Sequence, residues 1–264
     1  MTPGVASILR MTLFGAGLLF FLWLELKRPY RPETVPKARR WFVNLGLTAV
    51  NTLVLALVLG GLPLFTALYV QEHQIGVLNL VRMPYWLKVL AGVAFMDFML
   101  YVWHLLNHEM PLLWRFHRVH HTDLNMDVST ATRFHLGELL ISAFIKVGLI
   151  YFLGADVLTV VIFESALVLC AQFQHSSLRI SPAWEAPIWP LLVPPSMHRI
   201  HHSVKIRERN SNYGTIFSIW DRILGTLVKE VDQDGIVIGV GGHFDPARLG
   251  LPHLFIMPFT RRVP

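Results

Sequence analysis

DFMLYVWHLLNHEMPLLWRFHRVHHTD, at positions 97–123, is an apolar run that ends in a segment rich in histidine. Its histidines have the spacings H-x3-H and H-x2-H-H, and a second H-x2-H-H follows at positions 198–202. On a helix, residues three or four apart share a face, so each group can direct several imidazoles toward one point. These eight residues are His104, His108, His117, His120, His121, His198, His201 and His202.

The number of clustered histidines indicates metal binding. A lone histidine on a helix is usually an ordinary surface or core residue, but three such groups in one chain are hard to explain in that way. Neutral imidazole is the commonest metal-ligand side chain. Eight imidazoles exceed the four ligands of a structural zinc site. The number suits two metal ions, each with room for a small molecule.

The composition is that of a membrane protein. Of the 264 residues, 53% are hydrophobic and 15% are charged, against about 25% charged in an average soluble protein. The single cysteine, Cys170, excludes a disulfide framework and a cysteine zinc knuckle. The net charge of +6 is not arranged as a basic stripe, so we expect contact with a membrane surface and no nucleic-acid partner.

Four apolar stretches follow one another along the chain, at about 7–26, 41–69, 86–107 and 139–174. A bilayer requires about 20 apolar residues, and the last stretch is broken near Gly154, which predicts a helical hairpin. We interpret the first stretch as a retained anchor rather than a signal peptide. The fold class is therefore predicted to be all-α, an integral membrane helical bundle of about four to five apolar helical segments with a cytoplasmic histidine-rich cap.

Charge placement orients these segments. Residues 27–40 contain six lysines and arginines, whereas residues 71–84 contain only Arg82. Cytoplasmic loops are the basic ones, so this bias places every clustered histidine on the cytoplasmic face. Lys146 and Glu164 lie at similar distances from the hairpin turn on opposite arms. We predict that they approach each other, because unpaired charges in a membrane are costly.

Several chemistries are compatible with these ligands, because imidazole suits zinc, copper, iron and nickel. A zinc-dependent membrane hydrolase would need a carboxylate base, for which Glu109 and Glu138 are candidates. A non-catalytic metal-binding or transport protein would need polar groups along its membrane helices, which are few here. A site under apolar helices, where lipid chains can enter, favours an oxidising metal centre.

The chain resembles the membrane-bound fatty acid hydroxylase and sterol desaturase superfamily of histidine-box di-iron proteins. The matching stretches are residues 97–123, FQHSSL (173–178), PPSMHRIHHS (194–203) and NYGTIFSIWDRILGT (212–226). The resemblance implies two iron ions, O2 as cosubstrate and hydroxylation or desaturation of a lipid, which could be a sterol, fatty acyl chain, ether lipid or carotenoid. It also implies a separate electron donor protein, since we see no cytochrome b5-like haem domain.

The resemblance also assigns residues. By position it makes ligands of the eight clustered histidines, and it adds His175 as a ninth. Asp97, His135 and Asn212 are candidates for contact with a ligating histidine or for an additional ligand. Some members of the superfamily have a further H-x3-H group after the helical hairpin. This chain has only His175 there, which favours the sterol desaturase-like or alkylglycerol monooxygenase-like branches. We expect N-terminal transmembrane helices over 1–84, a catalytic domain over 85–226 and a tail over 227–264.

Overall fold

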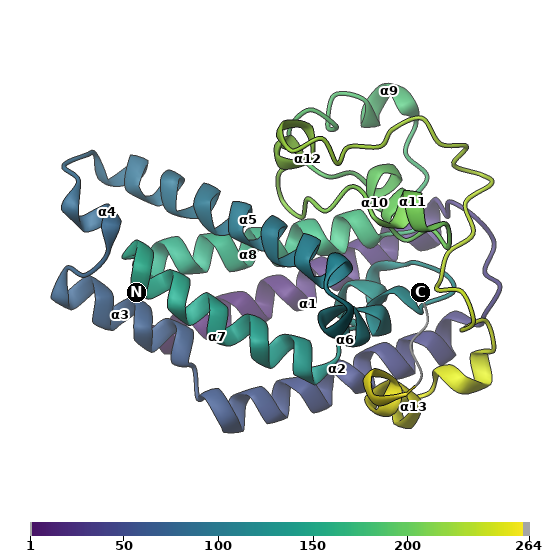
Figure 1. Cartoon of the computed structure of the whole chain (residues 1–264), viewed down its shortest axis with the longest axis horizontal. Helices are drawn as coiled ribbons and strands as arrows, with labels where there is room; N and C mark the ends of the chain where they lie inside the picture. The colour runs from purple at the N-terminus through teal and green to yellow at the C-terminus, as the bar shows by residue number, and fades with distance from the viewer. Residues whose placement is uncertain (1, 261–264) are drawn as a thin grey trace.

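The computed structural model describes residues 2–260. Their regular secondary structure is helical, with three isolated β-bridges and no β-strand. This confirms the predicted all-α class. Five helices are long and apolar enough to cross a membrane, within the predicted number of segments. They are α1 (Pro3–Lys27), α2 (Lys37–Leu59), α5 (Tyr85–Glu109), α7 (Leu136–Leu153) and α8 (Val157–His175), arranged as a bundle in Figure 1.

The second apolar stretch differs from the expectation, because it is two helices rather than one. Helix α2 ends at Gly60, and α3 (Leu62–His73) begins after Gly61. Both glycines have positive φ angles, 52° and 83°, a conformation that glycine adopts without the steric cost that a Cβ atom brings. The chain can therefore turn sharply here, and α3 packs against α7. A short helix, α4 (Val77–Leu80), then leads into α5.

The predicted hairpin is confirmed. Helices α7 and α8 are joined only by residues 154–156, with Gly154 at a φ of 80°. Asp156 then caps α8, since its Oδ1 accepts a hydrogen bond of 2.8 Å from the backbone N–H of Thr159. A left-handed glycine followed two residues later by a capping aspartate ends one helix and starts the next.

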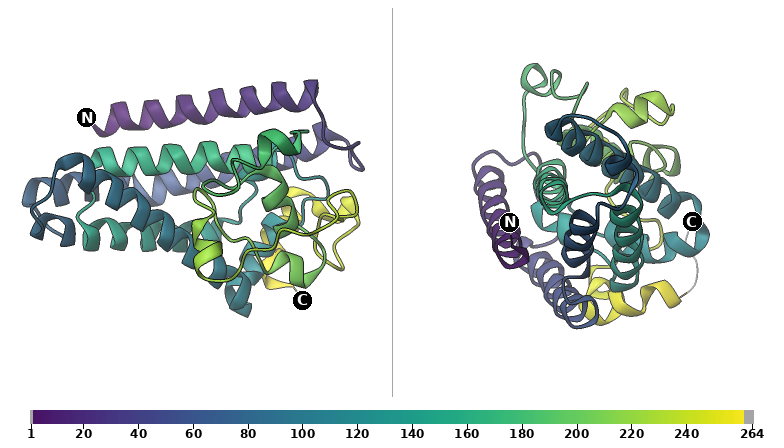
Figure 2. Two further views of the ribbon diagram at one scale, coloured as in Figure 1. Left: turned by 90° about the horizontal axis from the view of Figure 1, so that it is seen from above. Right: turned by 90° about the vertical axis from the view of Figure 1, so that its left-hand side faces the viewer.

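An ion-pair cluster joins three helices within the bundle. Nζ of Lys146 lies 2.6 Å from Oε1 of Glu164, as predicted for opposite arms of the hairpin. A guanidinium nitrogen of Arg10 lies 2.8 Å from the other oxygen of Glu164. Arg10 belongs to α1, which runs alongside α8 (Figure 2). Glu164 therefore links α1, α7 and α8.

Glu164→Leu is expected to lower the free energy of unfolding by about 3 kcal/mol, because both cations lose their partner in an apolar environment. Lys146→Met is the matched control: Glu164 keeps Arg10, so the loss should be about 1 kcal/mol. Denaturation of the detergent-solubilised protein measures both. Equal losses in the two variants would contradict the shared role of Glu164.

The remaining elements gather at one end of the bundle (Figure 1). Two apolar clusters attach the C-terminal residues there: Leu47 and Val119 pack with Leu254, and Met126 and Ile200 with Ile236 and Ile238. The elements at this end are α6 (Pro111–His121), η1 (Val128–Thr132), α9 (Pro182–Glu185), α10 (Pro195–His201), α11 (Ile206–Arg209), α12 (Ile219–Ile223), η2 (Pro246–Leu249), α13 (Leu251–Ile256) and η3 (Met257–Phe259).

Candidate metal centre

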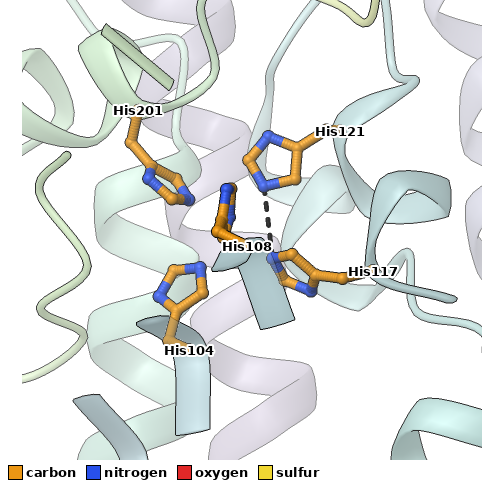
Figure 3. Close-up of side chains that lie close together, drawn as sticks. All are labelled: His104, His108, His117, His121 and His201. Carbon is orange, nitrogen blue, oxygen red and sulfur yellow. Dashed lines mark hydrogen bonds between the residues drawn. The ribbon is translucent and has the colours of Figure 1, made fainter. Parts of the chain in front are cut away.

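Five histidines from three helices form one group of converging rings. Their ligand nitrogens all lie within 4.8 Å of one another. Figure 3 shows the five rings directed toward a common point. They are His104 and His108 of α5, His117 and His121 of α6 and His201 of α10.

Four histidines form a second group, which we call the tetrad: His120, His175, His198 and His202. Nε2 of His175 lies 3.0 Å from Nε2 of His120, 3.0 Å from Nε2 of His198 and 3.2 Å from Nε2 of His202. All four residues are buried. His175, which the resemblance implies as a ninth ligand, therefore contacts all three other histidines of the tetrad.

Hydrogen bonding alone does not explain the tetrad. Each imidazole nitrogen carries either one proton or one lone pair, so Nε2 of His175 cannot bond three other nitrogens at once. Four ligands at about 2.05 Å from a tetrahedral metal ion are separated by about 3.3 Å, close to the 3.0–3.2 Å found here. The nitrogen arrangement therefore fits a metal ion.

Hydrogen bonds donated by Nδ1 orient several rings. Three rings donate from Nδ1 to a backbone carbonyl over 2.7–2.8 Å. His104 donates to the carbonyl of Tyr213, His175 to that of Ala171 and His201 to that of Ser211. A proton on Nδ1 leaves the Nε2 lone pair free for a metal. Nε2 of His104 and Nε2 of His201 are buried without a hydrogen-bond partner in the structure, which fits ligand positions.

The surroundings of five histidines in α6 and in or next to α10 disfavour the charged imidazolium. Burial first, and neighbouring histidines second, hold the pKa of His120, His121 and His202 well below the ordinary value. The same causes lower the pKa of His198 and His201. Only the neutral imidazole offers a lone pair to a metal, so this environment favours coordination over protonation.

Glu138 orients His117, a role that the sequence interpretation missed because it considered Glu138 only as a hydrolytic base. Its Oε1 accepts a hydrogen bond of 2.8 Å from Nδ1 of His117, and both side chains are buried. A carboxylate in this position fixes the tautomer and raises the basicity of the ligand. The signal in the sequence was weak, since the two residues are 21 positions apart.

Glu138→Leu is expected to weaken metal affinity by about 10–100-fold, the usual effect of removing a carboxylate that orients a ligating histidine. Competition with a chelator of known affinity measures the change. Glu230→Gln, an exposed glutamate, is the control and should bind metal as the parent does. An unchanged affinity in Glu138→Leu would contradict the orienting role.

A buried polar network holds the segment that follows the second histidine box, the H-x2-H-H group of His117, His120 and His121. Asp123 accepts hydrogen bonds from Nε of Arg40 at 2.7 Å and from the side chains of Asn44 and Thr130. Although burial alone would raise it, Arg40 and Arg133 hold the pKa of the Asp123 carboxyl well below its usual range. This network ties α2 to η1 just beyond the box.

The three additional candidates lie outside both histidine groups. Asp97 accepts hydrogen bonds from the backbone of Ile216 and Phe217 and from the Trp220 indole, so it holds residues 216–220 against α5. His135 caps α7 through the N–H of Gly137 and contacts the carbonyl of Phe255.

Asn212 has a φ of 55° and binds the backbone of Met197 and Val228. For all three, the recorded hydrogen bonds are with non-histidine groups. They therefore support the loops and helix ends around the metal centre.

A cavity of about 330 Å³ adjoins both groups. Its wall includes His104, His117, His120, His175 and His198 at one end. Apolar side chains of α5, α7 and α8 form most of the remainder, among them Met96, Trp103, Leu139, Leu149, Phe163 and Leu167. The space therefore extends from the two histidine groups between helices that are able to span a membrane.

Fold and site together define a class: a helical protein with helices able to span a membrane, nine buried histidines in two groups that could each hold a metal ion, and an apolar cavity beside them. The sequence model of the fatty acid hydroxylase family matches residues 89–226, just over half of the chain. The chain belongs to this family. No solved structure matches it.

Curated relatives are similar over much of this chain. An ornithine lipid hydroxylase, OlsE, of Rhizobium tropici is 29% identical over 68% of this chain and 52% of its own length. The human alkylglycerol monooxygenase is 27% identical over 85% of this chain and 55% of its own. The rat cholesterol 25-hydroxylase is 26% identical over 78% of this chain and 67% of its own. The chain thus spans about half the length of the first two relatives.

Proposed function

We propose that this protein is a membrane-bound non-haem di-iron oxidoreductase that hydroxylates or desaturates a lipid, with O2 and two electrons from a separate donor protein. The observation that supports this most strongly is the pair of histidine groups at the end of a cavity between membrane helices. The relatives support it too, because their names describe hydroxylation or monooxygenation of lipids.

The nine buried histidines would hold the two ions, five at one position and four at the other. When bound, the iron ions would supply the oxidising power that an unactivated C–H bond requires. The protein's own groups have different tasks. Backbone carbonyls and Glu138 hold the Nδ1 protons, so that the rings keep their orientation through a reaction cycle.

The cavity would position the substrate. Its apolar wall suits a lipid chain, and it excludes water from the reacting carbon. We further propose that the histidine end faces the cytoplasm, as the basic residues between α1 and α2 indicate. A soluble or membrane-bound donor could then deliver electrons at the surface formed by the C-terminal elements.

A labelling experiment tests the proposal. Membranes containing the protein would be supplied with an electron donor and isotopically labelled dioxygen, and their lipids analysed by mass spectrometry. We expect a lipid that carries one labelled oxygen atom or has lost two hydrogens, absent in His198→Ala. Lipid hydrolysis without label would contradict the oxidoreductase and favour a zinc hydrolase.

A further inference from the structure

Besides histidines, four residues of the cavity wall have a buried polar atom without a hydrogen-bond partner among the described residues: Asn107, Glu138, Gln172 and Gln174. Gln172 lies against α1, where its amide nitrogen donates to the carbonyl of Phe14 and its oxygen lies beside Gly17, which leaves the other three as candidates for contact with a ligand. Asn107 is 1% exposed, and both its amide nitrogen and its amide oxygen are unpartnered. Oε2 of Glu138 and Oε1 of Gln174 are also buried and unpartnered. All three residues line the same cavity. An unmade hydrogen bond of a buried polar group is unfavourable, so three such groups in the wall of one cavity indicate a ligand.

The three residues lie next to histidines of the two groups, at the histidine end of the cavity. Asn107 lies one helical turn after His104, Glu138 holds His117, and Gln174 precedes His175. Two polar side chains farther along the same wall, Ser142 and Lys146, already have partners. The Ser142 hydroxyl donates to the carbonyl of Leu139, and Lys146 pairs with Glu164.

The chemistry of the three groups is dominated by acceptors. Glu138 and Gln174 each present a bare oxygen, and Asn107 adds one further oxygen and one N–H2 donor. A hydroxyl or an amide N–H can donate to these oxygens. A carboxylate cannot donate, and Glu138 would repel it. An unsubstituted hydrocarbon would leave every group unpaired.

We propose that Asn107, Glu138 and Gln174 form a subsite for a neutral hydrogen-bond donor of the lipid, a hydroxyl or an amide N–H, within a few bonds of the oxidised carbon. This inference rests on the proposed function and specifies its substrate class. The enzyme would thus act near the polar end of an alcohol or amide lipid, and neither on a free fatty acid nor in the middle of a hydrocarbon chain.

Binding can be measured without turnover, because Trp103 lies in the same wall. The probes are octadecanol, octadecanamide and octadecanoic acid, each brominated in mid-chain, and the matching brominated octadecane. Bromine quenches tryptophan fluorescence, and subtraction of the Trp103→Phe signal isolates the cavity. We expect the alcohol and the amide to bind at least about tenfold more tightly than the acid and the hydrocarbon, the effect of roughly one good hydrogen bond.

Asn107→Leu and Gln174→Leu, on different helices, should each reduce that preference to about twofold while the metal content per chain stays at the parent value. Ser142→Ala, whose hydroxyl is already bonded to the backbone, is the matched control and should keep the full preference. Two variants are used so that the preference can still be tested if one of them does not fold.

Equal binding of all probes, or tighter binding of the acid, would overturn the subsite and leave the proposed oxidation standing. Loss of metal in Asn107→Leu would overturn it too, because the amide would then serve the metal centre. If no probe binds, the cavity is not a lipid site. That result would overturn both the subsite and the proposal of a lipid substrate. A protein that contains no iron but binds the alcohol would contradict only the di-iron proposal.

Discussion

His175→Ala is expected to abolish lipid oxidation, with activity at least about a thousandfold lower, because removal of a metal ligand disables the group that performs the chemistry. Nε2 of His175 approaches the other three tetrad nitrogens within 3.2 Å, so its loss opens the whole group. Labelled-oxygen incorporation measures the activity, and elemental analysis should show the loss of one of two metal ions.

His135→Ala is the matched control for this prediction. His135 is also buried, but it caps α7 and lies outside both groups. Loss of the cap should lower stability by about 1 kcal/mol and leave metal content and product formation near the parent values. Full activity in His175→Ala, or loss of metal in His135→Ala, would contradict the assignment of the nine ligands.

Asp123→Asn is expected to cause the largest loss of stability, about 3–5 kcal/mol, because it removes a buried negative charge that pairs with Arg40, which also pairs with Asp127, and that offsets the charge of Arg133. Asp123 is 2% exposed and lies two residues after His121. The folded-state pKa of its carboxyl is lowered. Its contribution is therefore complete above the unfolded-state pKa of about 3.9 and is lost only as the pH falls below it.

Denaturation of the detergent-solubilised protein measures this change. Asp245→Asn is the control, since Asp245 forms an exposed ion pair with Arg248 at 3.6 Å and should contribute less than about 1 kcal/mol. If the two variants lost the same amount, the network around Asp123 would not support the second histidine box.

The sequence predicted which histidines gather, but not how they divide. In each H-x2-H-H box, the first and last histidines lie in one group and the middle histidine lies in the other. His117 and His121, for example, belong to the group of five, whereas His120 belongs to the tetrad. Successive residues on a helix point about 100° apart, so neighbouring histidines face different ions. Helix geometry accounts for this divergence, whereas the pairing of the two boxes depends on how α6 and α10 pack.

Other parts of the fold depended on contacts that the sequence does not display. The Gly60–Gly61 pair was a visible signal for the break between α2 and α3, and the interpretation of one segment overlooked it. The orienting role of Glu138 and the unpartnered amide of Asn107 arise where helices meet. Long-range packing determines such contacts, and local periodicity does not encode them.

Iron content is the most direct test of the central proposal. The protein would be purified in detergent after expression with excess iron, and its metals measured by elemental analysis in the parent and in His120→Ala. The proposal predicts about two iron ions per chain, one for each histidine group, and a lower content in the variant. Zinc alone, or no metal in well-folded protein, would contradict it.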